Sequence, residues 1–151
     1  MREGYELVRY DMDGNGHHAL FISKIGDEPF IKQLERKKGR REDAAKIAST
    51  IKRISVKGVD WAIESRCMKR IKGLGDRSIT VFEARNNEGK PIRVATYVHD
   101  DRDKTPVFLF DFIAHKGSDG GIEDGVKERA VRLAHEARAL LNEEEKQKTW
   151  L

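Results

Sequence analysis

Residues able to carry out acid/base and phosphate chemistry gather between positions 85 and 116 of this 151-residue chain. Strand periodicity would place Arg93, Tyr97 and His99 on one face of a single strand. Cleaving RNA without a metal ion requires a proton acceptor for the 2′-hydroxyl, a proton donor for the leaving 5′-oxygen, and cations beside the charged phosphorane. The residue types present here are sufficient for that chemistry.

The candidate catalytic residues have complementary roles. Arg85 and Arg93 suit phosphate binding because a planar guanidinium can hold two phosphate oxygens. Tyr97, His99 and His115 are acid/base candidates, and Lys116 is a further cation. The plainer interpretation stays open, since Arg and Glu on neighbouring strand positions often form surface ion pairs of little energetic weight. The set comprises Arg85, Arg93, Tyr97, His99, Asp111, His115 and Lys116.

A basic region precedes these residues. Residues 29–77 contain 15 Lys plus Arg against 6 Asp plus Glu, a net charge of +9, whereas the whole chain carries only +4. Clustered positive charge is typical of a surface that meets nucleic-acid phosphates, although lysine-rich helices are often simply solvated. The predicted RNA-binding residues are Lys37, Lys38, Arg40, Arg41, Lys52, Arg53, Lys69, Arg70 and Lys72.

Metal and cofactor chemistry lack a supporting motif, so we predict neither. The five histidines are scattered, and residues 11–16 resemble a calcium loop only superficially because the distal Glu is missing. Residues 73–75 lack the Lys-Ser/Thr of a phosphate-binding loop. Cys67 is the only cysteine, which excludes an intrachain disulfide and fits a reducing cytoplasm.

Length and hydropathy predict a single domain over residues 1–151. The apolar runs are interrupted by charges well before the ~20 residues that a membrane helix requires. We therefore expect a cytoplasmic protein without a membrane partner.

The expected elements follow from apolar periodicity and turn residues. Residues 5–10 and 18–23 predict a hairpin within residues 1–25, with Asp-Gly and Asn-Gly pairs in its turn. A short helix capped by Asp27 should end at Gly39, and a second helix should span residues 42–54. Strands are predicted over 78–85, 92–99 and 106–115, followed by a helix over 122–142 and a frayed charged tail over 143–151. Residues 56–66 suggest only a connecting segment with a helical turn.

This order predicts an α+β fold whose antiparallel β-sheet combines the N-terminal hairpin with a three-strand meander. The third meander strand, rich in Phe, should be central. Two N-terminal helices and a C-terminal helix would cover one face of the sheet. The opposite face would stay partly free, and a site could form there.

Four segments in this order resemble the phage-derived Gp49-like branch of the RelE/HigB toxin superfamily. They are Ile71–Asp76, Val81–Arg85, Arg93–Tyr97 and Phe108–Lys116, and the resemblance covers about Pro29 to Leu141. It implies a compact RelE-like domain, cleavage of mRNA in the ribosomal A site, and neutralisation by a cognate antitoxin, with which such toxins can form a heterotetramer.

Carried over by position, the resemblance gives functional roles to Arg85, Arg93, Tyr97 and Lys116. The sequence departs from the family pattern at three places: Ala84 stands where Leu is usual, His115 stands where Lys is common, and the hairpin from Tyr5 to Ser23 is longer than a single first strand. Catalytic residues also vary across this superfamily. Two noncatalytic functions therefore remain as alternatives, namely an RNA- or ribosome-binding module and a phage-derived protein-interaction module.

Overall fold

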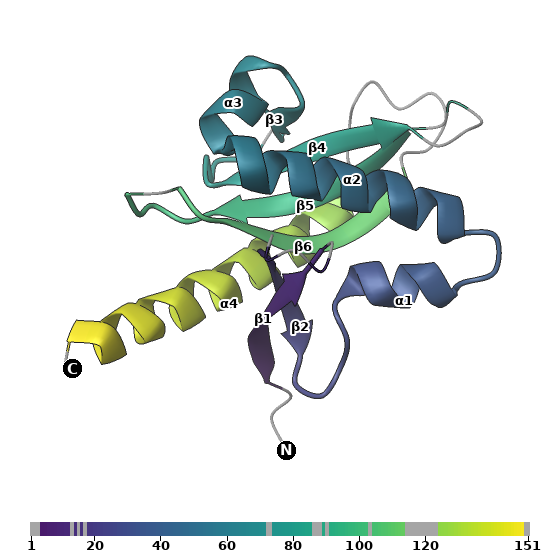
Figure 1. The fold of residues 1–151 in the computed structure, drawn as a ribbon. Helices are drawn as coiled ribbons and strands as arrows, with labels where there is room; N and C mark the ends of the chain where they lie inside the picture. The colour runs from purple at the N-terminus through teal and green to yellow at the C-terminus, as the bar shows by residue number, and fades with distance from the viewer. Residues whose placement is uncertain are drawn as a thin grey trace.

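A computed structural model gives the fold in Figure 1. The structure describes residues 4–12, 14, 16, 18–71, 74–85, 89, 91–102, 104–113 and 124–149. None of the helices in these ranges is long and apolar enough to cross a membrane.

The described strands form one six-stranded mixed sheet in the order β1-β2-β6-β5-β4-β3. Neighbouring strands are antiparallel except β2 and β6, which run parallel. The α+β class is confirmed, but the prediction of a fully antiparallel sheet is wrong, because the β2–β6 pairing joins segments far apart in the sequence and no local signal specifies its direction. The strands are β1 (Tyr5–Asp11), β2 (His18–Lys24), β3 (Met68–Arg70), β4 (Ile79–Arg85), β5 (Pro91–Val98) and β6 (Pro106–Ile113).

The N-terminal hairpin is confirmed, with Tyr5 opposite Lys24 and Asp11 opposite His18. Gly14 and Gly16 both have positive φ, the conformation for which glycine was expected in this turn. Asp11 accepts hydrogen bonds from the backbone N–H groups of both glycines, at 2.9 and 3.3 Å. The acidic side chain that suggested a calcium loop therefore fixes the turn.

The helices are α1 (Phe30–Arg36), α2 (Arg41–Lys57), α3 (Val59–Glu64) and α4 (Asp124–Thr149). The predicted Asp27 cap is wrong: Pro29 occupies the N-cap of α1, and no side chain caps this helix. The unassigned segment 56–66 contains the end of α2 and all of α3. Gly58, with φ of +93°, makes the break between the two helices. The short edge strand β3 was not predicted, since three residues carry too little pattern.

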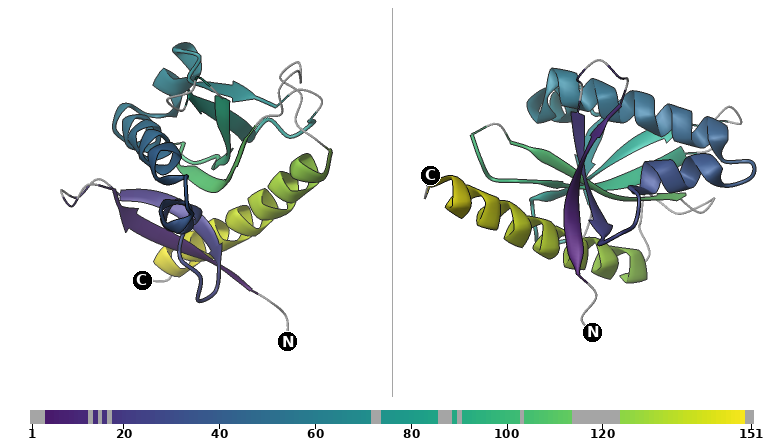
Figure 2. Two further views of the ribbon diagram at one scale, coloured as in Figure 1. Left: turned by 90° about the vertical axis from the view of Figure 1, so that its right-hand side faces the viewer. Right: turned by 60° about the horizontal axis from the view of Figure 1, so that its bottom comes forward.

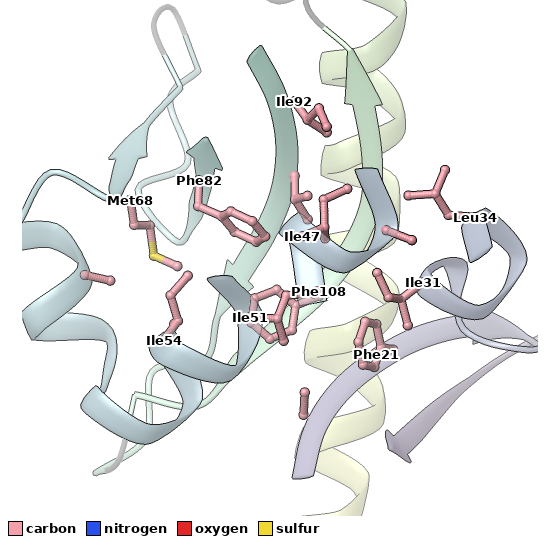
Figure 3. Close-up of a cluster of buried hydrophobic side chains, with 14 of the residues drawn as sticks. Phe21, Ile31, Leu34, Ile47, Ile51, Ile54, Met68, Phe82, Ile92 and Phe108 are labelled. Atoms are coloured by element: carbon pink, nitrogen blue, oxygen red, sulfur yellow. The ribbon is translucent and has the colours of Figure 1, made fainter. Parts of the chain in front are cut away.

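One hydrophobic core lies between the sheet and helices α1, α2 and α3 (Figure 3). The apolar stripe predicted for α2 is buried there: Ile47, Ile51 and Ile54 have no exposed surface. Phe82 and Phe108 meet them from the sheet, with their ring centres 5.8 Å apart in an edge-to-face arrangement. β6 lies between β2 and β5, and Val107 to Phe110 are all buried, which confirms the predicted central strand.

A second core lies on the opposite face, beneath α4 (Figure 2). Ala130, Ala134 and Ala137 of α4 pack against a sheet surface that includes Ala95 and Tyr97. The prediction of a partly free sheet face is therefore wrong. Small alanines at helical spacing let α4 approach this face closely.

The expected frayed tail over residues 143–151 is also wrong as far as the structure describes it, because α4 continues to Thr149. Glu144 is 3.3 Å from Arg9 of β1, and Glu145 is 3.0 Å from His99. These contacts attach the helix end to residues far away in the sequence, which explains why composition alone predicted fraying.

Candidate functional site

The structure separates the predicted catalytic residues into two groups at opposite ends of β5. Arg93 lies near the start of the strand, opposite Glu83, and Tyr97 lies near its end, opposite Ile79. Four residues of strand span roughly 13 Å, at about 3.3 Å per residue. Arg85 and Arg93 are brought together, whereas Tyr97 and His99 belong to a separate cluster.

The first group forms a charged corner where β4 ends and β5 begins. Glu83 is 3.2 Å from the Arg85 guanidinium and 3.7 Å from Arg93. The Arg85 side chain is 67% exposed, Glu83 35% and Arg93 16%. Arg85 also donates a hydrogen bond of 3.1 Å to the carbonyl of Gly89. We call Glu83, Arg85 and Arg93 the charged corner.

The charged corner combines a carboxylate, a group able to accept a proton, with two guanidinium groups, which are able to bind phosphate oxygens. One buried guanidinium nitrogen of Arg93, Nη1, has no hydrogen-bond partner within the described part of the chain. Buried polar atoms are usually paired, so this N–H group is an unsatisfied donor. Glu83 was considered from the sequence only as an ion-pair partner. The signal that could have found it was the β4–β5 register, which puts it directly opposite Arg93.

The second group is a buried hydrogen-bonded network under α4. The Tyr97 hydroxyl is 2.8 Å from His99 Nδ1, and His99 Nε2 is 3.0 Å from a Glu145 carboxylate oxygen. Arg138 Nε donates to the Tyr97 hydroxyl at 3.2 Å. A neutral histidine protonated on Nε2 satisfies every bond, because Nδ1 then accepts the tyrosine proton. Tyr97 and His99 are 1% and 4% exposed.

The network extends from Arg138 to the loop before β4. Arg138 lies 3.4 Å from Asp76 and donates to Ser78 Oγ at 3.0 Å. Burial raises the pKa of the Tyr97 phenol despite the nearby Arg138. Burial alone would raise the pKa of Asp76, but hydrogen bonds from Ser78 and Arg138 outweigh it and hold that pKa below its usual value.

A buried phenol whose hydroxyl is already hydrogen-bonded on both sides is poorly placed to meet an RNA phosphate. The geometry instead gives Tyr97 and His99 a positioning role, in which they hold α4 against the sheet. Of the remaining candidates, Asp111 lies on β6, where its backbone pairs with Val94. Ile113, the last residue of β6, pairs with Ile92 beside the charged corner. The Asp111 side chain, His115 and Lys116 lie outside the described part of the structure.

Some of the predicted RNA-binding residues are exposed, whereas others are partly buried or already paired with a residue of the protein. Arg40 is 2.9 Å from the buried Asp43, and Lys52 is partly buried on α2. Lys72 lies outside the described residues. The exposed members are Lys37, Lys38, Arg41, Arg53, Lys69 and Arg70.

Arg53 of α2 lies close to the start of β3. Its charge acts on the Cys67 thiol, the residue just before that strand, whose pKa is raised by burial and partly offset by Arg53. Lys69 and Arg70 follow on the edge strand itself and are exposed. We call Arg53, Lys69 and Arg70 the basic edge.

Across the described ranges, no group of three His, Cys, Asp or Glu side chains is arranged to hold a metal ion. Comparison with known proteins found no matching family model, no matching curated protein and no matching solved structure.

Proposed function

We propose that this chain is a toxin-type endoribonuclease that cleaves mRNA without a metal ion and uses the charged corner as its active site. The observation that carries the proposal is the position of Glu83, an accessible carboxylate 3.2 and 3.7 Å from the guanidinium groups of Arg85 and Arg93. The resemblance of the strand motifs to RelE/HigB-like toxins, noted from the sequence, points to the same activity.

In this mechanism Glu83 accepts the proton of the 2′-hydroxyl, which then attacks the adjacent phosphorus. Arg85 and Arg93 stabilise the charge that develops on the phosphorane oxygens, and the unpaired Nη1 of Arg93 gains an acceptor at that stage. His115 is the proposed proton donor to the leaving 5′-oxygen, with Lys116 as an additional cation. The basic edge would guide the RNA backbone toward the sheet.

The proposal includes a cytoplasmic location, the ribosome as the place of cleavage, and a cognate antitoxin as the inhibitor. An acidic antitoxin segment would complement the net charge of +9 over residues 29–77. Charge complementarity accelerates and directs such an association.

The test compares growth and mRNA ends after induced expression of the native chain and of Glu83→Gln, Arg85→Ala and Arg93→Ala. We expect growth arrest and new mRNA ends from the native chain. Each variant should lower cleavage at least about 100-fold, the usual scale for general-base or charge-stabilising groups. Glu64→Gln and Arg9→Ala are matched controls at exposed positions elsewhere. Unchanged growth with intact mRNA at high expression of the folded native chain would contradict the proposal.

A noncatalytic RNA-binding function is the second candidate, and the exposure of the basic edge favours it. It predicts salt-sensitive RNA binding by the purified chain without products in the presence or absence of a chelator. In that case Glu83→Gln would leave binding unchanged, whereas substitutions in the basic edge would weaken it.

A further inference from the structure

A separate cleft of about 590 Å³ opens where the parallel strands β2 and β6 move apart. These strands are paired only through Leu20 with Val107 and Phe21 with Phe108. The residues that follow at their carboxyl ends, from Ile22 to Lys24 and from Leu109 to Phe110, line the cleft. Crevices beyond the carboxyl ends of separating parallel strands are frequent ligand sites in sheets covered by helices.

The wall formed by α4 is basic. Arg129 and Arg132 are three residues apart on this helix, are both exposed, and line the cleft. The Arg129 guanidinium lies 4.6 Å from the ring centre of Phe110, which holds it over the sheet. Neither arginine forms an ion pair with another described residue, so two guanidinium groups are available for an anion.

A buried hydroxyl without a partner lines the same cleft. Ser23 is only 8% exposed, and its Oγ has no hydrogen-bond partner in the described part of the protein. Burying an unpaired hydroxyl is unfavourable, and such groups in native proteins usually have a function or bind an additional molecule. The Ser23 Oγ has almost no accessible surface, so a ligand group in the cleft would reach it only after the Ser23 side chain rotates toward the opening.

The remaining wall offers carboxylates and rings. The Glu28 carboxylate forms an ion pair with Arg36 at 2.8 Å. Asp27 is therefore the lining carboxylate that we expect to accept hydrogen bonds from a ligand. Tyr5 and Phe30 supply aromatic surface. The volume lies in the range of about 300 to 1,000 Å³ that is typical of small-molecule sites.

The geometry points to a binding site for a nucleoside monophosphate in this cleft, with the phosphate on Arg129 and Arg132. The sugar hydroxyls would donate to Asp27, Ser23 would complete the polar contacts, and the base would pack against Tyr5 or Phe30. This site shares no residue with the charged corner. It therefore does not depend on the proposed nuclease activity.

The test is calorimetric titration of the full chain with AMP, GMP, CMP and UMP, with adenosine and inorganic phosphate as separate probes. We expect at least one nucleotide to bind at least tenfold more tightly than adenosine or inorganic phosphate alone. Only a nucleotide contacts both the arginines of α4 and the part of the cleft that would hold the sugar and base. Arg132→Gln should weaken nucleotide binding about tenfold or more, the effect of losing a charged hydrogen bond. Ser23→Ala should weaken it less, without loss of folding, because its hydroxyl has no partner to lose among the described residues.

Lys127→Gln is the matched control, since it removes the same charge from α4 at a position outside the cleft. Circular dichroism of each variant excludes unfolding as the cause of lost binding. No binding of any nucleotide by the folded native chain would overturn the assignment. Equal affinity for AMP and inorganic phosphate, or an equal loss in Lys127→Gln and Arg132→Gln, would overturn it as well.

Discussion

Two buried threonines face each other across β4 and β5, yet their hydroxyls are in different situations. Thr80 Oγ1 donates a hydrogen bond of 3.4 Å to the Thr96 carbonyl, whereas Thr96 Oγ1 has no partner among the described residues. Thr96 has no exposed surface. The Thr96 side chain therefore loses hydration on folding and gains no bond in return.

We predict that Thr96→Val stabilises the protein by about 1 kcal/mol, because a methyl group of similar shape replaces an unsatisfied hydroxyl. Urea denaturation measures the free energy of unfolding. Thr80→Val is the control on the neighbouring strand and should be neutral or slightly destabilising. A loss of stability in Thr96→Val larger than that in Thr80→Val would contradict the prediction.

The Tyr97 hydroxyl joins Arg138 to His99 inside the second core. We predict that Tyr97→Phe lowers the free energy of unfolding by about 1 to 3 kcal/mol, since it leaves the buried Nδ1 of His99 without its partner. Tyr5→Phe is the control, because the Tyr5 hydroxyl has no hydrogen bond to a described residue. If the two variants unfolded at the same urea concentration, the network would contribute nothing to stability.

The last turns of α4 are fixed by two contacts of unequal weight. Arg9 and Glu144 form an ion pair whose side chains are 55% and 37% exposed, so water and salt screen it. The Glu145 side chain is 55% exposed, but the His99 imidazole that it meets is only 6% exposed. Because one partner of this contact is buried, water screens it less than the exposed ion pair.

We therefore predict that Glu145→Ala destabilises the protein by about 1 kcal/mol or more, and Glu144→Ala by less than about 0.5 kcal/mol. The two variants remove the same charge from adjacent helix positions, so each controls for the other. Hydrogen exchange of the amides in the last turns of α4 should rise more in Glu145→Ala. A larger effect of Glu144→Ala would show that the exposed ion pair fixes the helix end.

The loop before β4 is attached to α4 through Asp76, and this attachment should depend on pH. The folded-state pKa of Asp76 lies below the ordinary value of 3.8. Burial acts to raise this pKa, but the hydrogen bonds from Ser78 and Arg138 lower it by more than burial raises it. A carboxyl group whose pKa is depressed by folding contributes stability that is present above the unfolded pKa. That stability is lost as the pH falls through the folded pKa.

We predict that Asp76→Asn is less stable than the native chain at pH 6, and that the difference shrinks steadily as the pH falls below about 4. Urea denaturation at a series of pH values from 6 to 3 measures this difference. Its decline below about pH 4 is the signature of the titrating carboxylate. A difference that stays constant over the series would mean that the ionised carboxylate is not what stabilises the loop.

The parts of the molecule that sequence predicted well are those specified by nearby residues. The stripe of Ile47, Ile51 and Ile54 identified α2. The Asp-Gly and Asn-Gly pairs identified the hairpin turn, where Gly14 and Gly16 have positive φ. The parallel pairing of Leu20 with Val107 could not be read in the same way, because its partners lie far apart in the chain. Long-range pairing is chosen by the burial of whole surfaces, which local pattern does not encode.

The same limit explains the outcome for the candidate site. Alternation along β5 correctly put Arg93 and Tyr97 on one side of the strand, but it could not reveal that α4 covers Tyr97. The alanines that allow this approach, including Ala134 and Ala137, carry no sign in the sequence of the surface that they meet. Neighbouring-strand register, in contrast, brought Arg85 and Arg93 together around Glu83.

The charge distribution of the whole molecule leads to a last prediction, on RNA binding. Binding to single-stranded RNA releases counterions, so the logarithm of the affinity falls with the logarithm of the salt concentration by about 0.7 for each phosphate contact. Lys69→Ala with Arg70→Ala should weaken binding of an unstructured RNA and reduce this slope by about 1.4, since both residues belong to the exposed basic edge. Lys127→Ala with Lys146→Ala removes the same charge from α4 and should change the slope much less. If both pairs reduced the slope equally, the protein would attract RNA through its net charge alone, and the basic edge would not be the RNA-binding surface.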